Sequence, residues 1–291
     1  AQVPVWLVMA VDLLFLPLAA VCLAIPLIKV QQQRNLFFVP VLLLLTFCNA
    51  LMHYGLATGR FDMQQLGSQN AVWLITLLMA IVGGRVLPMF TANGTMTAKA
   101  QPIVWLDRIA LGSLWLIFIL NVTLLSSQLP PGAMGVLYAI AAFTLGWRCL
   151  RWRIWITWRV PLLWSLHIAY WMIPLGLMLF ALREFGVVAI TPSIALHALT
   201  AGAMGNMILA MLARVSLGHS GRPLQPKPIM SAAFMLVIVA ALTRVILNWL
   251  VPDLAMTWLI VAATAWIVAY AIYVVVYVPI LTTPRPDGRP G

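Results

Sequence analysis

The stretch LHALTAGAMGNMILAMLARVSLGH, residues 196–219, decides the fold class of this chain. Its single Lys or Arg is Arg214, and it carries no acidic side chain. A helix that crosses about 30 Å of hydrocarbon needs about 20 predominantly apolar residues. Because the stretch is long enough and apolar enough, it predicts a membrane-spanning helix.

Apolar runs of similar length fill the rest of the chain, so we expect nine spans. Turn-type segments separate the runs, and none is long enough for a soluble domain. Strand-like alternation of polar and apolar residues is absent, which leaves a closed helical bundle as the structure that satisfies the backbone in lipid. We predict an all-α, polytopic transmembrane helical bundle that forms a single domain over residues 1–291. The expected spans are 3–29, 36–57, 70–90, 103–125, 132–150, 161–183, 193–217, 229–250 and 254–281.

The amino-acid composition excludes several other classes. The chain has 291 residues, of which 64% are hydrophobic and 8% are charged. Soluble domains carry about 45–50% apolar and about 25% charged residues. This difference excludes a soluble enzyme, a nucleic-acid-binding domain and a disordered chain. The net charge of +11 therefore predicts contact with membrane lipids and no nucleic acid partner.

The distribution of Lys and Arg predicts the orientation of the spans. With residue 1 outside, fourteen of the 17 cationic side chains fall at the inner side. Because Lys and Arg are enriched in cytoplasmic loops, we expect a periplasmic N-terminus and a cytoplasmic C-terminus. The outer cations are Arg60, Arg183 and Arg244, and the inner ones are Lys29, Arg34, Arg85, Lys99, Arg108, Arg148, Arg151, Arg153, Arg159, Arg214, Arg222, Lys227, Arg285 and Arg289.

The first residue is Ala and not Met. An odd number of spans with an outer start fits a chain that lacks an earlier odd number of spans. We therefore expect missing N-terminal spans to be partners of this bundle.

The three cysteines, Cys22, Cys48 and Cys149, all lie in apolar runs. The chain contains neither Cys-x-x-Cys nor Cys-x-x-Cys-His. This excludes a thioredoxin-like pair and covalent attachment of c-type haem.

The segment WRCLRWRIWITWRVPLLW, residues 147–164, is rich in Trp and Arg. At a cytoplasmic boundary such residues form an interfacial belt beside the lipid headgroups. We expect Trp152 and Trp155 to belong to this belt and to have no role in a site.

The four histidines fall at two depths. At a rise of 1.5 Å per residue, His53 and His197 lie near the outer ends of their spans, and His167 and His219 lie toward the inner side. Ionisable side chains in a membrane are costly and often functional, and neutral imidazole is a common ligand of haem iron and copper. The depths predict ligand sites that pair His53 with His197 and His167 with His219. The alternative is that each ring only bonds a neighbouring carbonyl group.

Small residues accompany His197 along its span. His197, Ala201 and Gly205 follow one another at i, i+4 and i+8, which is one face of an α-helix. Such a stripe leaves room for a flat macrocycle, but it is also typical of small-xxx-small helix packing. Both interpretations stay open.

Sulfur ligands for copper are also available. Met204, Met207 and Met211 run along the same span, and Cys48 and Met52 lie beside the histidine of the second span. Soft thioether and thiol groups can hold Cu(I). A methionine stripe also serves as core filler, so these residues are candidates only.

Charged side chains near or inside the spans add further candidates. Asp12 lies near the middle of the first span, where a carboxylate needs a partner, and Arg244 or a histidine could supply it. Arg85, Arg214 and Arg222 lie at the inner boundary. They could reach lipid phosphates or hold the propionates of a haem.

Five segments of the chain carry a resemblance to a known family. They are NLFFVPVLLLLTFCNALMHYG (35–55), IVGGRVLPMFTANG (81–94), LDRIAL (106–111), VPLLWSLHIAYWMIPLG (160–176) and LHALTAGAMGNMILAMLARVSLGHSGRPL (196–224). In this order they resemble the NnrS family of polytopic bacterial inner-membrane proteins. Members of that family look like twelve-span proteins, of which this chain matches the last nine.

The resemblance implies a function in nitric oxide metabolism and the nitrosative stress response, with haem b and copper as cofactors. We expect a membrane haem or haem–copper protein that binds or turns over NO, or that passes electrons from a donor. A metal-free transporter or channel and an assembly subunit of a membrane complex are the alternatives.

Overall fold

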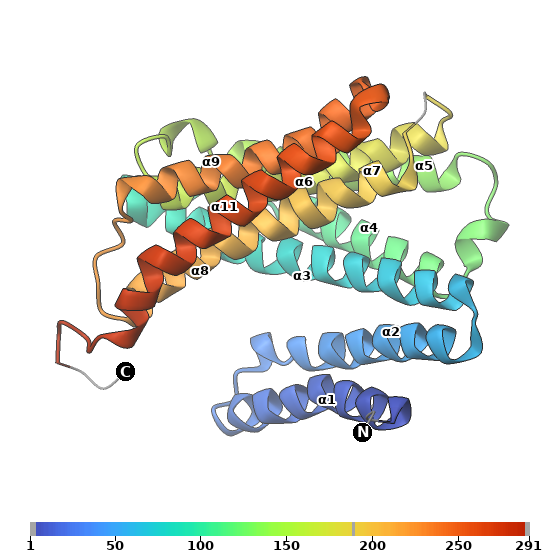
Figure 1. Cartoon of the computed structure of the whole chain (residues 1–291), viewed down its shortest axis with the longest axis horizontal. Coiled ribbons are helices and arrows are strands. Elements are labelled where there is room, and N and C mark those ends of the chain that lie inside the picture. The colour runs from blue at the N-terminus through green and yellow to red at the C-terminus, as the bar shows by residue number, and fades with distance from the viewer. Residues whose placement is uncertain (1–3, 188–189, 289–291) are drawn as a thin grey trace. The chain divides into compact units, whose positions relative to one another are not determined.

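The computed structural model describes residues 4–187 and 190–288, and these ranges contain helices and no strand (Figure 1). The predicted all-α class is therefore confirmed. The long helices are α1 (Val5–Lys29), α2 (Phe38–Thr58), α3 (Phe61–Thr95), α4 (Val104–Val122), α5 (Ala133–Arg151), α6 (Pro161–Glu184), α8 (Asn206–His219), α9 (Pro228–Leu242) and α11 (Ala255–Thr282). The short elements are η1 (Gln33–Asn35), η2 (Leu125–Gln128), η3 (Ile154–Ile156), α7 (Pro192–His197), η4 (Ala198–Gly205), η5 (Thr243–Leu247), α10 (Asn248–Leu250) and η6 (Pro252–Leu254).

Nine helices in the described ranges are long and apolar enough to cross a membrane, and each overlaps one of the nine predicted runs. The third is longer than predicted, at Phe61–Thr95 against 70–90. The span Pro192–His219 consists of α7, the π-helix η4 and α8. The span Pro228–Leu250 consists of α9, the π-helix η5 and α10. The chain is thus a polytopic membrane protein. Val3 and Arg289, which entered the predicted spans and the charge count, lie outside the described residues.

The helices form two compact units. The first unit comprises the residues up to 78 together with 115–129, and the second comprises 79–114 together with the residues from 130 onward. Helices α3 and α4 contribute to both, because the division falls within each of them. The single domain over residues 1–291 stays a prediction.

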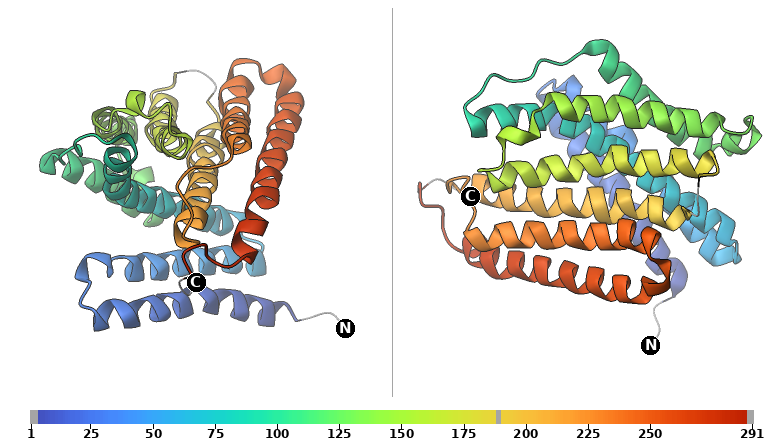
Figure 2. Two further views of the ribbon diagram at one scale, coloured as in Figure 1. Left: turned by 90° about the vertical axis from the view of Figure 1, so that its left-hand side faces the viewer. Right: turned by 90° about the horizontal axis from the view of Figure 1, so that it is seen from above.

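In the second unit, α6 is the most deeply buried span. Helices α5, α8 and α9 contact it, and α11 packs against α8 and α9. The right-hand view of Figure 2 shows α6, the α7–α8 span, α9 and α11 side by side. In the first unit, α1 packs along α2.

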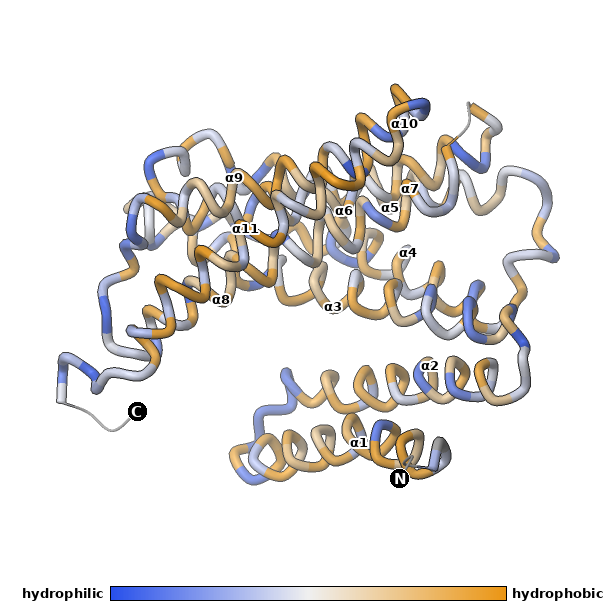
Figure 3. The backbone as a smooth tube through the Cα atoms, in the orientation of Figure 1, coloured by the Kyte–Doolittle hydropathy of each residue, from blue (hydrophilic) through white to orange (hydrophobic). Residues whose placement is uncertain are grey.

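The surface of the helices is apolar along most of their length. Hydrophilic residues gather at helix ends and connections, as Figure 3 shows. Large apolar side chains such as Phe143 and Val275 are exposed. This pattern fits helices whose solvent is lipid, because such a solvent cannot satisfy polar groups.

The two π-helical segments are stabilised by polar side chains. In η4 the hydrogen-bonding pattern shifts, and Asn206 Nδ2 donates to the carbonyl of Gly202 at 2.7 Å. At the start of η5, Thr243 Oγ1 donates to the carbonyls of Val239 at 2.9 Å and Ala240 at 3.0 Å. These bonds satisfy carbonyl groups near the wider turns, where hydrocarbon could not.

The predicted stripe of His197, Ala201 and Gly205 runs along the π-helix η4 and not along an α-helix. At Gly205, the indole of Trp266 occupies the space that a Cβ atom would fill. The hydroxyl of Tyr270 donates to the Gly205 carbonyl at 2.9 Å. Gly205 therefore serves helix packing and does not provide room for a macrocycle.

Replacing Gly205 by Ala tests this packing. The new methyl group would overlap Trp266, so we expect the free energy of unfolding to fall by about 1–3 kcal/mol. The matched control is Gly112→Ala, because no atom lies within 4 Å of a Cβ built there. Thermal unfolding of both variants in the same detergent provides the measurement, and equal midpoints would contradict the proposed role of Gly205.

Candidate functional site

The second unit contains an enclosed ion pair. The guanidinium of Arg148 on α5 is 6% exposed, and its Nε lies 2.6 Å from Oδ1 of Asp107 on α4. Its Nη1 donates to the hydroxyl of Tyr170 at 3.1 Å and to the carbonyl of Ala80 at 3.4 Å. The Tyr170 hydroxyl donates to the same carbonyl at 3.2 Å. Helices α3, α4, α5 and α6 therefore meet around one cation.

Close packing of α3 makes this arrangement possible. A Cβ atom at Gly84 would overlap the Arg148 guanidinium, and one at Gly83 would overlap the Tyr170 ring. Only hydrogen at these two positions lets α3 approach Arg148 and Tyr170 so closely.

The burial of Arg148 and of its neighbour Trp152 shows that two predictions were wrong. Arg148 was counted with the charges of the inner boundary, but it is buried among helices. Trp152 was expected in the interfacial belt, but it is 6% exposed and its ring centroid lies 4.7 Å from that of Tyr170. Trp155 is 55% exposed, which agrees with a belt residue. The signal that could have found the pair is that Asp107 and Arg148 both fall inside consecutive predicted spans.

His167 lies on α6 beside this cluster. Its side chain is 1% exposed, its Nε2 lies 2.7 Å from Thr91 Oγ1, and its ring meets Trp152 edge to face with centroids 6.4 Å apart. Its Nδ1 is buried and has no hydrogen-bond partner among the described residues. One ring nitrogen of His167 is therefore held by the protein, and the other is not.

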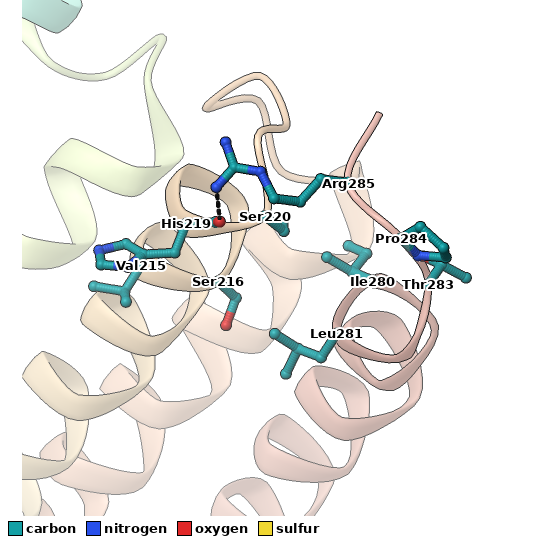
Figure 4. A pocket seen from close by; sticks show the side chains of 9 residues that line it. All are labelled: Val215, Ser216, His219, Ser220, Ile280, Leu281, Thr283, Pro284 and Arg285. Carbon is teal, nitrogen blue, oxygen red and sulfur yellow. Dashed lines mark hydrogen bonds between the residues drawn. The ribbon is translucent and has the colours of Figure 1, made fainter. Parts of the chain in front are cut away.

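His219 ends α8 at the rim of a pocket of about 450 Å³. Figure 4 shows its imidazole on the Val215 side, with Ile280 and Leu281 of α11 across the pocket. Nη1 of Arg285 donates to the His219 carbonyl at 2.8 Å. The contacts of His219 share no residue with those of His167 in the part of the chain described, and the pairing of these two histidines stays a prediction.

Two arginines stand at the rim of this pocket. Arg222 Nη2 donates to Thr283 Oγ1 at 2.6 Å, and Thr283 lines the pocket. Arg285 makes two hydrogen bonds to Asp287, at 2.9 and 2.6 Å, and these raise its pKa above the ordinary value. The rim therefore carries guanidinium charge at all physiological pH values.

The other two predicted arginines have different surroundings. The Arg214 guanidinium lies over the ring of Phe90, 3.8 Å from its centroid, which is a cation–π contact. Arg85 is half-buried on α3 and interacts with another group of the protein. Neither has a described contact with the His219 pocket.

His197 is the last residue of α7, and a hydrogen bond defines the tautomer of its ring. Its Nδ1 lies 2.5 Å from the carbonyl oxygen of Ser193, which can only accept, so Nδ1 carries the proton. In the neutral ring Nε2 then presents a lone pair, the arrangement in which histidine ligates metals. Met204, Met207 and Met211, the candidate copper ligands of this span, are half-buried.

In the first unit, His53 is the partner of Asp12. Its Nε2 donates to Asp12 Oδ2 at 2.7 Å, and Asn49 Nδ2 donates to the same oxygen at 2.7 Å. Of the two candidate partners, a histidine thus binds the carboxylate. Met52 instead packs against Gly67 of α3. Cys48 and Met52, four residues apart, both lie on the side of α2 next to Gly67, whereas the His53 ring points to Asp12.

No group of three or more His, Cys, Asp or Glu side chains that could hold a metal ion occurs among the described residues. A metal held by this chain would need fewer of these ligands or would draw on other donors.

The family model described as NnrS protein matches residues 1–285. The chain belongs to the NnrS family. No curated protein and no solved structure matches the chain.

Membership confirms the resemblance, and the structure shows what three of its segments do together. The NnrS-like segment 81–94 supplies Gly83 and Gly84, segment 106–111 supplies Asp107, and segment 160–176 supplies Tyr170. All of them contact Arg148 or the ring that binds it. The Arg148 cluster thus joins segments of this NnrS chain that lie far apart in sequence.

Breaking the Arg148 ion pair should be costly. Asp107→Asn leaves an enclosed guanidinium without its counter-charge, and we expect a loss of about 3 kcal/mol in the free energy of unfolding. Arg183→Gln is the control, because the Arg183 side chain is 40% exposed in its pair with Glu184, against 6% for Arg148, and pairs with an exposed cation contribute little. Denaturation in mixed micelles measures both; similar losses in the two variants would contradict an essential role for the enclosed pair.

Proposed function

We propose that this protein is an integral-membrane haem protein of the nitric oxide and nitrosative stress response, in which histidine side chains hold haem b. Its family name provides the link to nitric oxide. The observation that carries the haem proposal is the His219 pocket, where an imidazole without a described hydrogen-bond partner stands beside guanidinium and hydroxyl groups.

The residues of the His219 pocket fit haem b. Its volume of about 450 Å³ falls in the usual range for small-molecule sites, about 300–1,000 Å³. His219 offers a ring nitrogen, Ile280 and Leu281 offer apolar surface, and Arg222 and Arg285 offer donors for acid groups. This is the donor set that a macrocycle with propionates requires.

His197 fits a second ligand position. The hydrogen bond from Nδ1–H to Ser193 fixes the ring and leaves Nε2 as a ligand atom. His53 is oriented in the same way by Asp12, but through Nε2, so its Nδ1 would be the ligand atom. His167 could offer only its enclosed Nδ1. His53 with His197 and His167 with His219 remain the proposed pairs.

When bound, haem supplies an iron atom that can take histidine and NO as ligands. The chain's own contribution is to orient the imidazoles and to keep water away with apolar helices. An open iron position would favour NO binding or turnover, whereas two histidines on each iron would favour electron transfer from a donor. We extend the proposal to copper at Met207 and Met211, whose thioethers lie on α8; Cys48 and Met52 are weaker candidates.

The test is a spectrum of the purified full-length protein after haem-replete expression. We expect a Soret band that shifts on addition of NO, together with iron in metal analysis. His219→Ala and His197→Ala should each weaken or shift the band, whereas Asn93→Ala, at an exposed position, should not. A colourless, metal-free protein would contradict the proposal and favour a transporter, a channel or an assembly subunit.

We also propose that the protein lies in the bacterial inner membrane with the N-terminus of this chain periplasmic and its C-terminus cytoplasmic. The supporting observation is the excess of Lys and Arg on one side of the spans.

Reporter fusions test this orientation. Green fluorescent protein after Gly291 should fluoresce, and alkaline phosphatase at the same position should be inactive. Fusions after Gly59, in the turn between α2 and α3, should show the opposite pattern. Active phosphatase after Gly291 would reverse the proposed topology.

A further inference from the structure

Arg244 is a cation inside a span without a counter-charge. It is the second residue of η5, and its side chain is half-buried. Among the described residues it makes no hydrogen bond, ion pair or ring contact, in contrast to Arg148 with Asp107. A guanidinium at such a depth is costly, and intramembrane charges commonly mark functional sites.

The chain's own carboxylates do not provide the counter-charge. The sequence contains six Asp and Glu residues. Five of them already pair with a basic side chain: Asp12, Asp62, Asp107, Glu184 and Asp287. The sixth, Asp253, is exposed on η6, and no contact between it and Arg244 is described.

His197 is the polar neighbour of Arg244. Helix α7, which His197 ends, packs against η5, and the charge of Arg244 reaches the imidazole. Because Nδ1–H is engaged by the Ser193 carbonyl, the ring adds a polar wall but no second fixed positive charge. Arg244 thus remains the source of charge at this position.

The backbone at this position is also unusual. Arg244 lies within the π-helix η5, and the π-helix η4 begins directly after His197. π-Helical turns inside α-helices are rare and occur frequently at functional sites. Two neighbouring spans therefore carry this feature, one at Arg244 and the other directly after His197.

We propose that Arg244, with His197 beside it, binds a carboxylate or oxyanion group between α7 and η5. A guanidinium presents planar, paired N–H donors that match the two oxygens of such a group. The group can come from a free small anion or from a propionate of a haem held by His197. The second source, but not the first, rests on the proposed function.

Formate is the probe for this site, because it is the smallest carboxylate. Full-length protein without haem is placed in phosphatidylcholine nanodiscs, and broadening of the ¹³C-formate signal is titrated. We expect saturable binding that Arg244→Gln weakens about tenfold or more and that Arg244→Lys partly retains. The matched control is Arg183→Gln, because Arg183 belongs to the same predicted outer set but is paired with Glu184.

Two results would overturn the proposal. One is the absence of saturable formate binding in the wild-type protein, or equal binding in wild type and Arg244→Gln. The other is formate binding that emerges only in Asp253→Asn, which would make Asp253 the hidden counter-ion of Arg244.

Two further experiments, with haem b and with haem dimethyl ester, distinguish the possible sources of the anionic group. Loading with haem b should abolish formate binding if a propionate occupies the site, whereas haem dimethyl ester, with its acid groups blocked, should not. Formate binding that survives both treatments identifies a free anion. Formate binding in a protein that takes up no haem upholds the anion site while the proposed haem function fails.

Discussion

An enclosed guanidinium requires a partner for its charge, and the second unit is organised around this requirement at Arg148. Asp107 neutralises the charge from α4, and Tyr170 and the Ala80 carbonyl accept from Nη1. Gly84 lets α3 approach, since any larger residue would overlap the guanidinium. The positions of four helices are therefore coupled through a single side chain. In lipid this coupling is strong, because water cannot replace a lost partner.

The nine spans could be predicted from the sequence because each depends on a local property, the run length of apolar residues. Arg148 and Trp152 could not be assigned in this way. A count of cations treats each as solvated at the boundary, and an indole suits a lipid interface as well as a core. Whether either side chain turns inward depends on Asp107 and Tyr170, which are supplied by other helices. The π-helices were missed because they depend on backbone hydrogen bonding that leaves no periodicity in the sequence.

Depth in the membrane grouped the histidines into two pairs, but the structure distinguishes all four by their hydrogen bonds. His53 donates a hydrogen bond from Nε2 to a carboxylate, and His197 donates one from Nδ1 to a carbonyl. His167 is held by a threonine hydroxyl, whereas His219 stands at a pocket rim. These partners determine which nitrogen is left to act as a ligand. Such information depends on tertiary contacts, which is why depth alone could not rank the four rings.

The π-helix η4 has a consequence for the span that contains both His197 and His219. Each residue of an α-helix turns by about 100°, so one additional residue in a wide turn rotates everything beyond it relative to a regular helix. The wide turn thus sets the rotation of α8 relative to α7 about the axis of the span. Deleting one residue from η4 would leave the side chains of α7 and α8 unchanged but would rotate those of α8 relative to those of α7. The relative orientation of the His197 and His219 imidazoles therefore depends on the length of η4, which contains neither histidine.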